Sequence, residues 1–173
     1  MTEPDHDRDN AFWRFSLEVY AAPGVEAECL ALQALHDVDV NLLLFCAWAG
    51  AERRWCLARA DVDHMRQAVR AWQETVVKPL RSARRALETL GLQNEAARDL
   101  RARIAADELE AERIEQALLF ALTPAKAELR RDAGREADAS QIVRDNVALL
   151  LDGRPGALHE ALIAAALRAA QPN

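Results

Sequence analysis

The sequence predicts an all-α fold, a single-domain bundle of about seven helices around a buried central helix over residues 40–49. Ala and Leu supply 60 of the 173 residues, whereas Val, Ile and Thr together supply 18. This balance favours helix, because β-branched side chains lose rotamer freedom in a helix. Leu42 to Ala49 is a run of eight apolar residues, so a helix there is apolar on every side and must be surrounded. The run is shorter than the ~20 residues of a membrane-spanning helix, and Gly50 can end or bend it.

Two shorter helices are predicted before the central one. Residues 10–20 hold four of the nine aromatic residues, and Pro23 followed by Gly24 ends that helix. Cysteine and leucine at helical spacing predict a second helix over 25–36.

Two long helices follow, and we expect them to pair as an antiparallel hairpin. Over 61–90 the apolar residues step by three and four, with Asp61 as the predicted cap. Pro79 lies inside this helix and predicts a kink or a break. A second long helix over 94–122 carries a similar stripe, and the short connection between the two favours a hairpin.

The C-terminal third is less regular. Residues 123–139 are charged and predict either a connector or a short exposed helix, and further helices are expected over 140–151 and 157–170. The predicted boundaries are a disordered tail over 1–9, one helical domain over 10–170 and a second tail over 171–173.

Charge and cysteine usage narrow the class of protein. The net charge of −6 argues against a nucleic-acid-binding protein. The acidic first residues are unlike a signal peptide. Three cysteines without CxxC spacing are typical of reduced, buried thiols. We therefore expect a cytoplasmic protein with no membrane span.

Four motifs occur together in the first two thirds of the chain: FWRFS at 12–16, CLALQ at 29–33, DVNLLLFCAW at 39–48 and LEAERIEQ at 109–116. Together they resemble a family of small proteobacterial proteins catalogued only as a domain of unknown function. The resemblance covers roughly residues 12–122. It implies a bacterial, cytosolic, helical protein and implies no activity.

Six basic side chains lie off the apolar stripe of the first long helix. The segment 52–85 holds nine Lys/Arg against four Asp/Glu, although the chain as a whole is acidic. These side chains could bind phosphates or an acidic protein surface. Alternatively, they form a solvated face that pairs with the acidic side of the second long helix. The six are Arg66, Arg70, Lys78, Arg81, Arg84 and Arg85.

Two further sets of polar residues are candidates for a site. The helical angle of Asp107 places it within the apolar stripe of its helix, where a carboxylate needs a partner or must protonate. With Glu112 it could form a polar site between the long helices; the alternatives are a structural ion pair or an exposed edge. Asp37, Asp39 and Asn41 could line a polar pocket beside Trp48, although helix capping and turn formation explain all three at no extra cost.

No motif predicts a catalytic residue, a cofactor or a metal site. The leading hypothesis is a non-enzymatic interaction module that binds an unidentified protein partner through its basic helix or exposed aromatic residues; a homodimer is possible. The alternative is a carrier of a small apolar or lipid-like ligand, with a pocket beside the central helix lined by Phe45, Trp48 and Trp72. A more remote alternative is an enzyme with an acidic site at Asp107 and Glu112.

Overall fold

A computed structural model describes residues 9–90, 94–123, 138–153 and 159–171. The described residues form α-helices and one π-helical segment, with no strand, so the predicted all-α class is confirmed. The proposed tails, apart from Asp9 and Gln171, lie outside the described residues. So does residue range 124–137, most of the segment expected as a charged connector.

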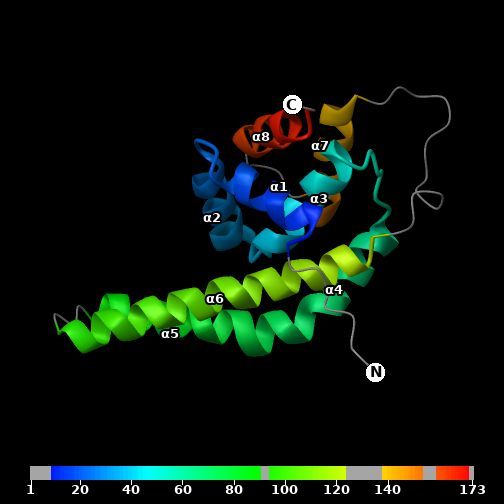
Figure 1. Cartoon of the computed structure of the whole chain (residues 1–173). Helices are drawn as coiled ribbons and strands as arrows, with labels where there is room; N and C mark the ends of the chain where they lie inside the picture. Colours follow the sequence, from blue (N-terminus) through cyan, green and yellow to red (C-terminus); the bar gives the residue numbers. More distant parts are fainter. Residues whose placement is uncertain (1–8, 91–93, 124–137, 154–158, 172–173) are drawn as a thin grey trace.

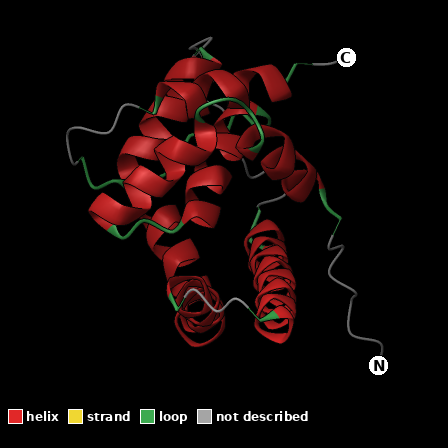
Figure 2. Ribbon diagram, turned by 90° about the vertical axis from the view of Figure 1, so that its left-hand side faces the viewer, coloured by secondary structure: helices red, strands yellow, loops and turns green. Residues whose placement is uncertain are grey.

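The described helices group into a body and an arm. Helices α1, α2, α3, α7 and α8 gather into the body, whereas α5 and α6 lie side by side and project beyond it (Figure 1). Figure 2 shows this pair nearly end-on below the body. In chain order the elements are α1 (Ala11–Tyr20), α2 (Val25–His36), α3 (Val40–Ala51), α4 (Arg59–Trp72), η1 (Gln73–Val77), α5 (Lys78–Thr89), α6 (Glu95–Ala121), α7 (Ala139–Leu150) and α8 (Glu160–Ala169). Because α4, η1 and α5 run on without a break, these amount to seven helical rods, as the sequence predicts.

Helix α3 forms the centre of the core, as predicted. Every residue after Val40 in this helix is buried, and α1, α2, α6, α7 and α8 all pack against it. The rings of Phe12, Phe45 and Trp48 lie with their centroids 5.2 to 5.5 Å apart. Asp39 caps the helix, its Oδ1 accepting a hydrogen bond of 2.8 Å from the Asn41 backbone amide.

Gly50 does not end this helix, so that part of the prediction is wrong. The helix continues through Gly50 to Ala51. A Cβ atom added at Gly50 would lie 2.9 Å from the backbone and side chain of Val143 on α7. The glycine is needed because two helix backbones approach closely at this point.

Helix α4 begins two residues earlier than predicted. Its first residue is Arg59, and Asp61 acts from inside the first turn, accepting a 2.7 Å hydrogen bond from the Ala58 amide. Pro79 causes no break. Its ring would clash with the carbonyl four residues earlier in a regular helix, and the π-helical segment η1 lies at that place.

The antiparallel hairpin of α5 and α6 is confirmed. Residues later in α5 contact residues earlier in α6: Arg81 faces Glu108, whereas Glu88 lies 3.4 Å from Arg101. Helix α5 has no fully buried residue, so the outer arm rests on half-buried side chains and ion pairs.

The C-terminal helices cover α3 and α1. Helix α7 begins at Ala139 with Asp138, rather than Ser140, as its cap; Asp138 accepts a 3.1 Å hydrogen bond from the Ser140 amide. Helix α8 packs on α1 and α2, and two of its backbone amides donate to the Glu28 carboxylate at 2.9 and 3.0 Å. No described helix is both long and apolar enough to cross a bilayer.

Candidate functional site

An ion-pair network joins α5 to α6. Arg81 donates to Glu108 at 3.0 Å and to Glu112 at 2.5 Å, and Arg84 donates to Glu108 at 2.5 Å. Burial alone would raise the pKa of the Glu108 carboxyl, but the hydrogen bonds from the two guanidinium groups outweigh it and lower this pKa. Burial raises the pKa of Glu112 despite its contact with Arg81. Glu108 is therefore ionised and held by two arginines.

The predicted basic set divides into paired and unpaired members. Arg81 and Arg84 form ion pairs with α6, which agrees with the alternative that the basic face pairs with the acidic side of the second long helix. Arg66 donates to the Leu150 carbonyl and lies 3.6 Å from Asp152. By contrast, Arg70 and Arg85 are exposed and form no ion pair with another described residue.

Asp107 is exposed, which agrees with the alternative of an exposed edge and contradicts a position within a buried stripe. The next residue, Glu108, is the one that faces α5. Periodicity fails here because it assumes that the buried face is apolar, whereas α6 turns polar side chains inward wherever α5 and α3 supply partners for them.

A cluster of buried polar side chains connects α3, η1 and α6. Glu115 has no exposed surface. Its carboxylate oxygens accept from Asn41 Nδ2 at 3.2 Å and from Gln73 Nε2 at 3.5 Å, and Gln116 Nε2 donates to Asn41 Oδ1 at 2.9 Å. Burial, together with the hydrogen bond and negative charge of Asp39, raises the pKa of Glu115 to about 10. Glu115 is therefore neutral near pH 7.

One pocket, here named the leucine groove, lies between the body and the arm and has a volume of about 310 Å³. Leu17, Leu30 and Leu109 are 50%, 44% and 52% exposed along it. Its walls include Arg84 and Arg85, and its lining also includes Asn41, Glu112 and Gln116. The groove thus combines half-exposed leucines with arginines and with the buried polar side chains of Asn41 and Gln116.

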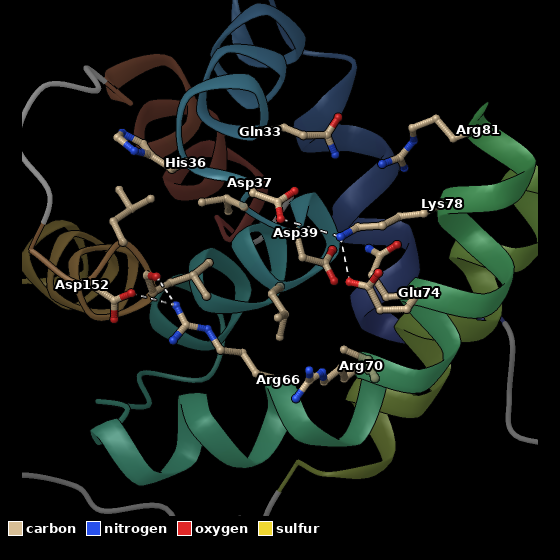
Figure 3. Close-up of a pocket in the computed structure, with 16 residues that line it drawn as sticks. Gln33, His36, Asp37, Asp39, Arg66, Arg70, Glu74, Lys78, Arg81 and Asp152 are labelled. Atoms are coloured by element: carbon tan, nitrogen blue, oxygen red, sulfur yellow. Dashed lines mark hydrogen bonds and ion pairs between the residues drawn. The ribbon is translucent and has the colours of Figure 1, made fainter. Parts of the chain in front are cut away.

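A second pocket, here named the charged pocket, has a volume of about 520 Å³ (Figure 3). It lies where the turn before α3 meets α4, η1 and the end of α7. Its lining combines acidic, basic and apolar side chains, among them Asp37, Asp39, Leu42, Arg66, Val69, Arg70, Gln73, Glu74, Lys78, Leu150, Leu151 and Asp152.

The apolar pocket predicted beside Phe45, Trp48 and Trp72 corresponds to neither the leucine groove nor the charged pocket. Phe45 and Trp48 belong to the packed core, and Trp72 donates its Nε1 proton to the Ala111 carbonyl at 2.9 Å. None of the three lines the leucine groove or the charged pocket.

The cysteines offer no reactive thiol in the core. Burial raises the pKa of Cys29 and of Cys46 to about 12, so both stay protonated. Within the four described ranges, no three His, Cys, Asp or Glu side chains gather to hold a metal ion.

The fold and its pockets define a small all-α bundle with a projecting helical hairpin. Residues 11–119 match the family model described as "Protein of unknown function (DUF2390)", and the chain belongs to that family. No curated protein and no solved structure matched the chain. The matched region contains α1 to α5 and all of α6 except its last two residues, and with them the leucine groove.

Sequence reasoning missed four residues of the polar cluster and network: Gln73, Glu108, Glu115 and Gln116. A signal for two of them was present. Glu108, Glu112 and Glu115 recur at spacings of four and three, which places them on one helix face. Arg81 and Arg84 recur at a spacing of three on the helix predicted to pair with it, so charge periodicity would have predicted the network.

Proposed function

We propose that this protein is a non-enzymatic, cytoplasmic interaction module whose leucine groove binds an acidic amphipathic helix of a partner protein. The observation that carries the proposal is the set of three half-exposed leucines around one groove. Each comes from a different helix, α1, α2 or α6. Clustered exposed leucines are typical of a binding surface, whereas single ones are ordinary.

A helix is the partner structure that fits the three leucines of the groove. An amphipathic helix presents anchors at positions i, i+3 or i+4 and i+7, which fill apolar pockets along a groove. Burying a fully exposed leucine side chain contributes about 1.5–3 kcal/mol. Each of the three half-exposed leucines would therefore contribute part of that free energy when a partner covers it.

The charge at the groove favours an acidic partner. Arg84 is engaged by Glu108, but Arg85 is exposed on the same wall and pairs with no other described residue. A carboxylate on the partner beside Arg85 would add a charge-assisted hydrogen bond. This retains the predicted role of the basic helix for one arginine of the set.

An acidic active site has less support. Glu108 and Glu112 are bound by arginines, and Glu115 is fully buried, so none is free to exchange a proton with a substrate. A carrier of a small apolar ligand is the second candidate, because the groove runs beside Val40 and Leu44 of α3. Its volume of about 310 Å³ is near the lower end for ligand pockets.

Site-specific photocrosslinking tests the proposal. A photoreactive phenylalanine analogue at Leu109 should capture a partner in the native cytosol, and mass spectrometry should locate the crosslink in an acidic amphipathic helix. The same analogue at Leu90, which is exposed but outside the groove, should not capture it. Capture lost in Leu17→Glu would assign it to the groove.

Three results would contradict the proposal. Equal capture from positions 90 and 109 would show non-specific contact. A crosslink to a second copy of this chain, with a dimer mass by light scattering, would make the groove a homodimer interface. A crosslinked lipid or small molecule in place of a peptide would favour the carrier.

A further inference from the structure

We propose that the charged pocket binds a small zwitterion with an apolar side chain, a free α-amino acid or a dipeptide. In this assignment Arg70 holds the carboxylate and Asp39 holds the ammonium group. The site is separate from the leucine groove, so it goes beyond the proposed function and does not depend on it.

Charge pairing within the pocket points to a zwitterion. Lys78 lies 2.7 Å from Glu74 and 3.7 Å from Asp37, and Arg66 pairs with Asp152. Lys78 is thus shared by two carboxylates, and two further charged residues of the lining lie outside these ion pairs. Arg70 and Asp39 line the pocket from α4 and from the turn before α3 (Figure 3), and neither forms an ion pair with a described residue.

The unmatched charges have opposite signs, and this selects among ligands. A simple anion at Arg70 would leave the Asp39 carboxylate without a counter-ion, and a simple cation at Asp39 would do the same for Arg70. A molecule with one charge of each sign satisfies both.

A buried acceptor supports the ammonium end. Gln73 is 8% exposed and lines the pocket. Its Nε2 donates to Glu115, but its Oε1 has no hydrogen-bond partner among the described residues. An unpaired buried acceptor is costly. A ligand N–H group in the pocket would satisfy it, and Asp39 lines the same pocket.

The remaining lining selects an apolar side chain. Leu42, Val69, Leu150 and Leu151 are buried residues that also line the pocket. A volume of about 520 Å³ lies within the range of small-molecule sites and leaves room for one or two amino-acid residues.

Isothermal titration calorimetry of the full chain tests this assignment. The probes are L-leucine and leucyl-leucine, with N-acetyl-leucine lacking the ammonium group, leucinamide lacking the carboxylate, and inorganic phosphate. We expect leucine or its dipeptide to bind at least about tenfold more tightly than any of the other three, a difference that one lost ion pair supplies. The tighter of the two zwitterions identifies the ligand as an amino acid or a dipeptide.

Variants with matched controls assign the two ends. Arg70→Gln and Asp39→Asn should each weaken binding of the better probe about tenfold or more; asparagine is also a good N-cap, so α3 keeps its start. Arg98→Gln removes an exposed arginine of α6 that lines neither pocket and should leave binding unchanged. The proposal is overturned if phosphate or N-acetyl-leucine binds as tightly as leucine. Absence of heat with both zwitterions at millimolar concentration, or wild-type binding by Arg70→Gln, overturns it equally.

Discussion

Different interactions stabilise the body and the arm. In the body, α3 is buried by five other helices, and its aromatic residues pack against those of α1. In the arm, α5 has no fully buried residue, and Arg81 and Arg84 fasten it to Glu108 and Glu112. Apolar burial is non-directional, whereas an ion-pair network depends on geometry and on protonation. The body should therefore resist changes of pH that loosen the arm.

Removing an aromatic residue from the body should have the largest effect. Trp48→Ala leaves a cavity beside Phe12 and Phe45 and should lower the free energy of unfolding by about 3–5 kcal/mol. Urea denaturation followed by far-UV circular dichroism measures this. A loss below about 1 kcal/mol would show that the body is not organised around α3.

Breaking the network in the arm should have a smaller effect. Glu108→Gln leaves two arginines without their shared carboxylate and should cost about 1–3 kcal/mol at pH 7. Because the folded-state pKa of Glu108 is lowered, its contribution is present above the ordinary glutamate pKa and is lost as the pH falls through the folded-state value. The two proteins should therefore converge in stability in acid.

Glu88→Gln provides the matched control for the arm. Glu88 pairs across the same hairpin with Arg101, but both side chains are exposed. Exposed pairs contribute about 0–1 kcal/mol, so this variant should unfold close to wild type. Equal losses in the two variants would contradict the view that buried pairs hold the arm.

Neutralising the buried acid between body and arm should stabilise the protein at higher pH. Glu115 has a folded-state pKa of about 10, so folding takes up a proton between the ordinary glutamate pKa and that value. Stability is therefore full below the ordinary pKa and falls as the pH rises toward 10, by at most ~1.4 kcal/mol per pH unit. In Glu115→Gln the side chain does not titrate, so this variant should not lose stability in this way as the pH rises. Urea denaturation at pH 5 and pH 8 should show it gaining about 1–2 kcal/mol on wild type at the higher pH; parallel curves would contradict a neutral Glu115.

The smallest effect is expected at the end of the arm. Leu90 is 66% exposed, and Leu90→Gln should change the free energy of unfolding by no more than about 0.5 kcal/mol. Chemical denaturation checks this value. A larger loss would mean that this leucine is covered in solution, for example by a second chain.

The body was easier to predict from the sequence than the arm and the site. Eight consecutive apolar residues admit one interpretation for α3, and the stepped stripes predict the long helices. The inward face of α6 was mistaken because its buried residues include Glu108 and Glu115, which can be inside only when Arg81, Arg84, Asn41 and Gln73 face them. Periodicity within one helix cannot show such a partner.

Gly50 illustrates the same difficulty. A glycine inside an apolar run resembles a helix end, yet here it makes room for Val143, 93 positions later in the chain. The pockets were also beyond prediction, since each gathers residues from segments far apart in the sequence.

Because α4, η1 and α5 form one uninterrupted helical path, any rotation of the arm relative to the body would take place at η1. Gln73, the first residue of η1, donates a hydrogen bond to Glu115. Lys78, the first residue of α5, forms ion pairs with Glu74 and Asp37. A swing of the arm would thus change the hydrogen bonding of a buried carboxyl group and the shape of the charged pocket together. Fluorophores on the arm near Leu90 and on the body near Leu35 would record that swing as a change in their separation.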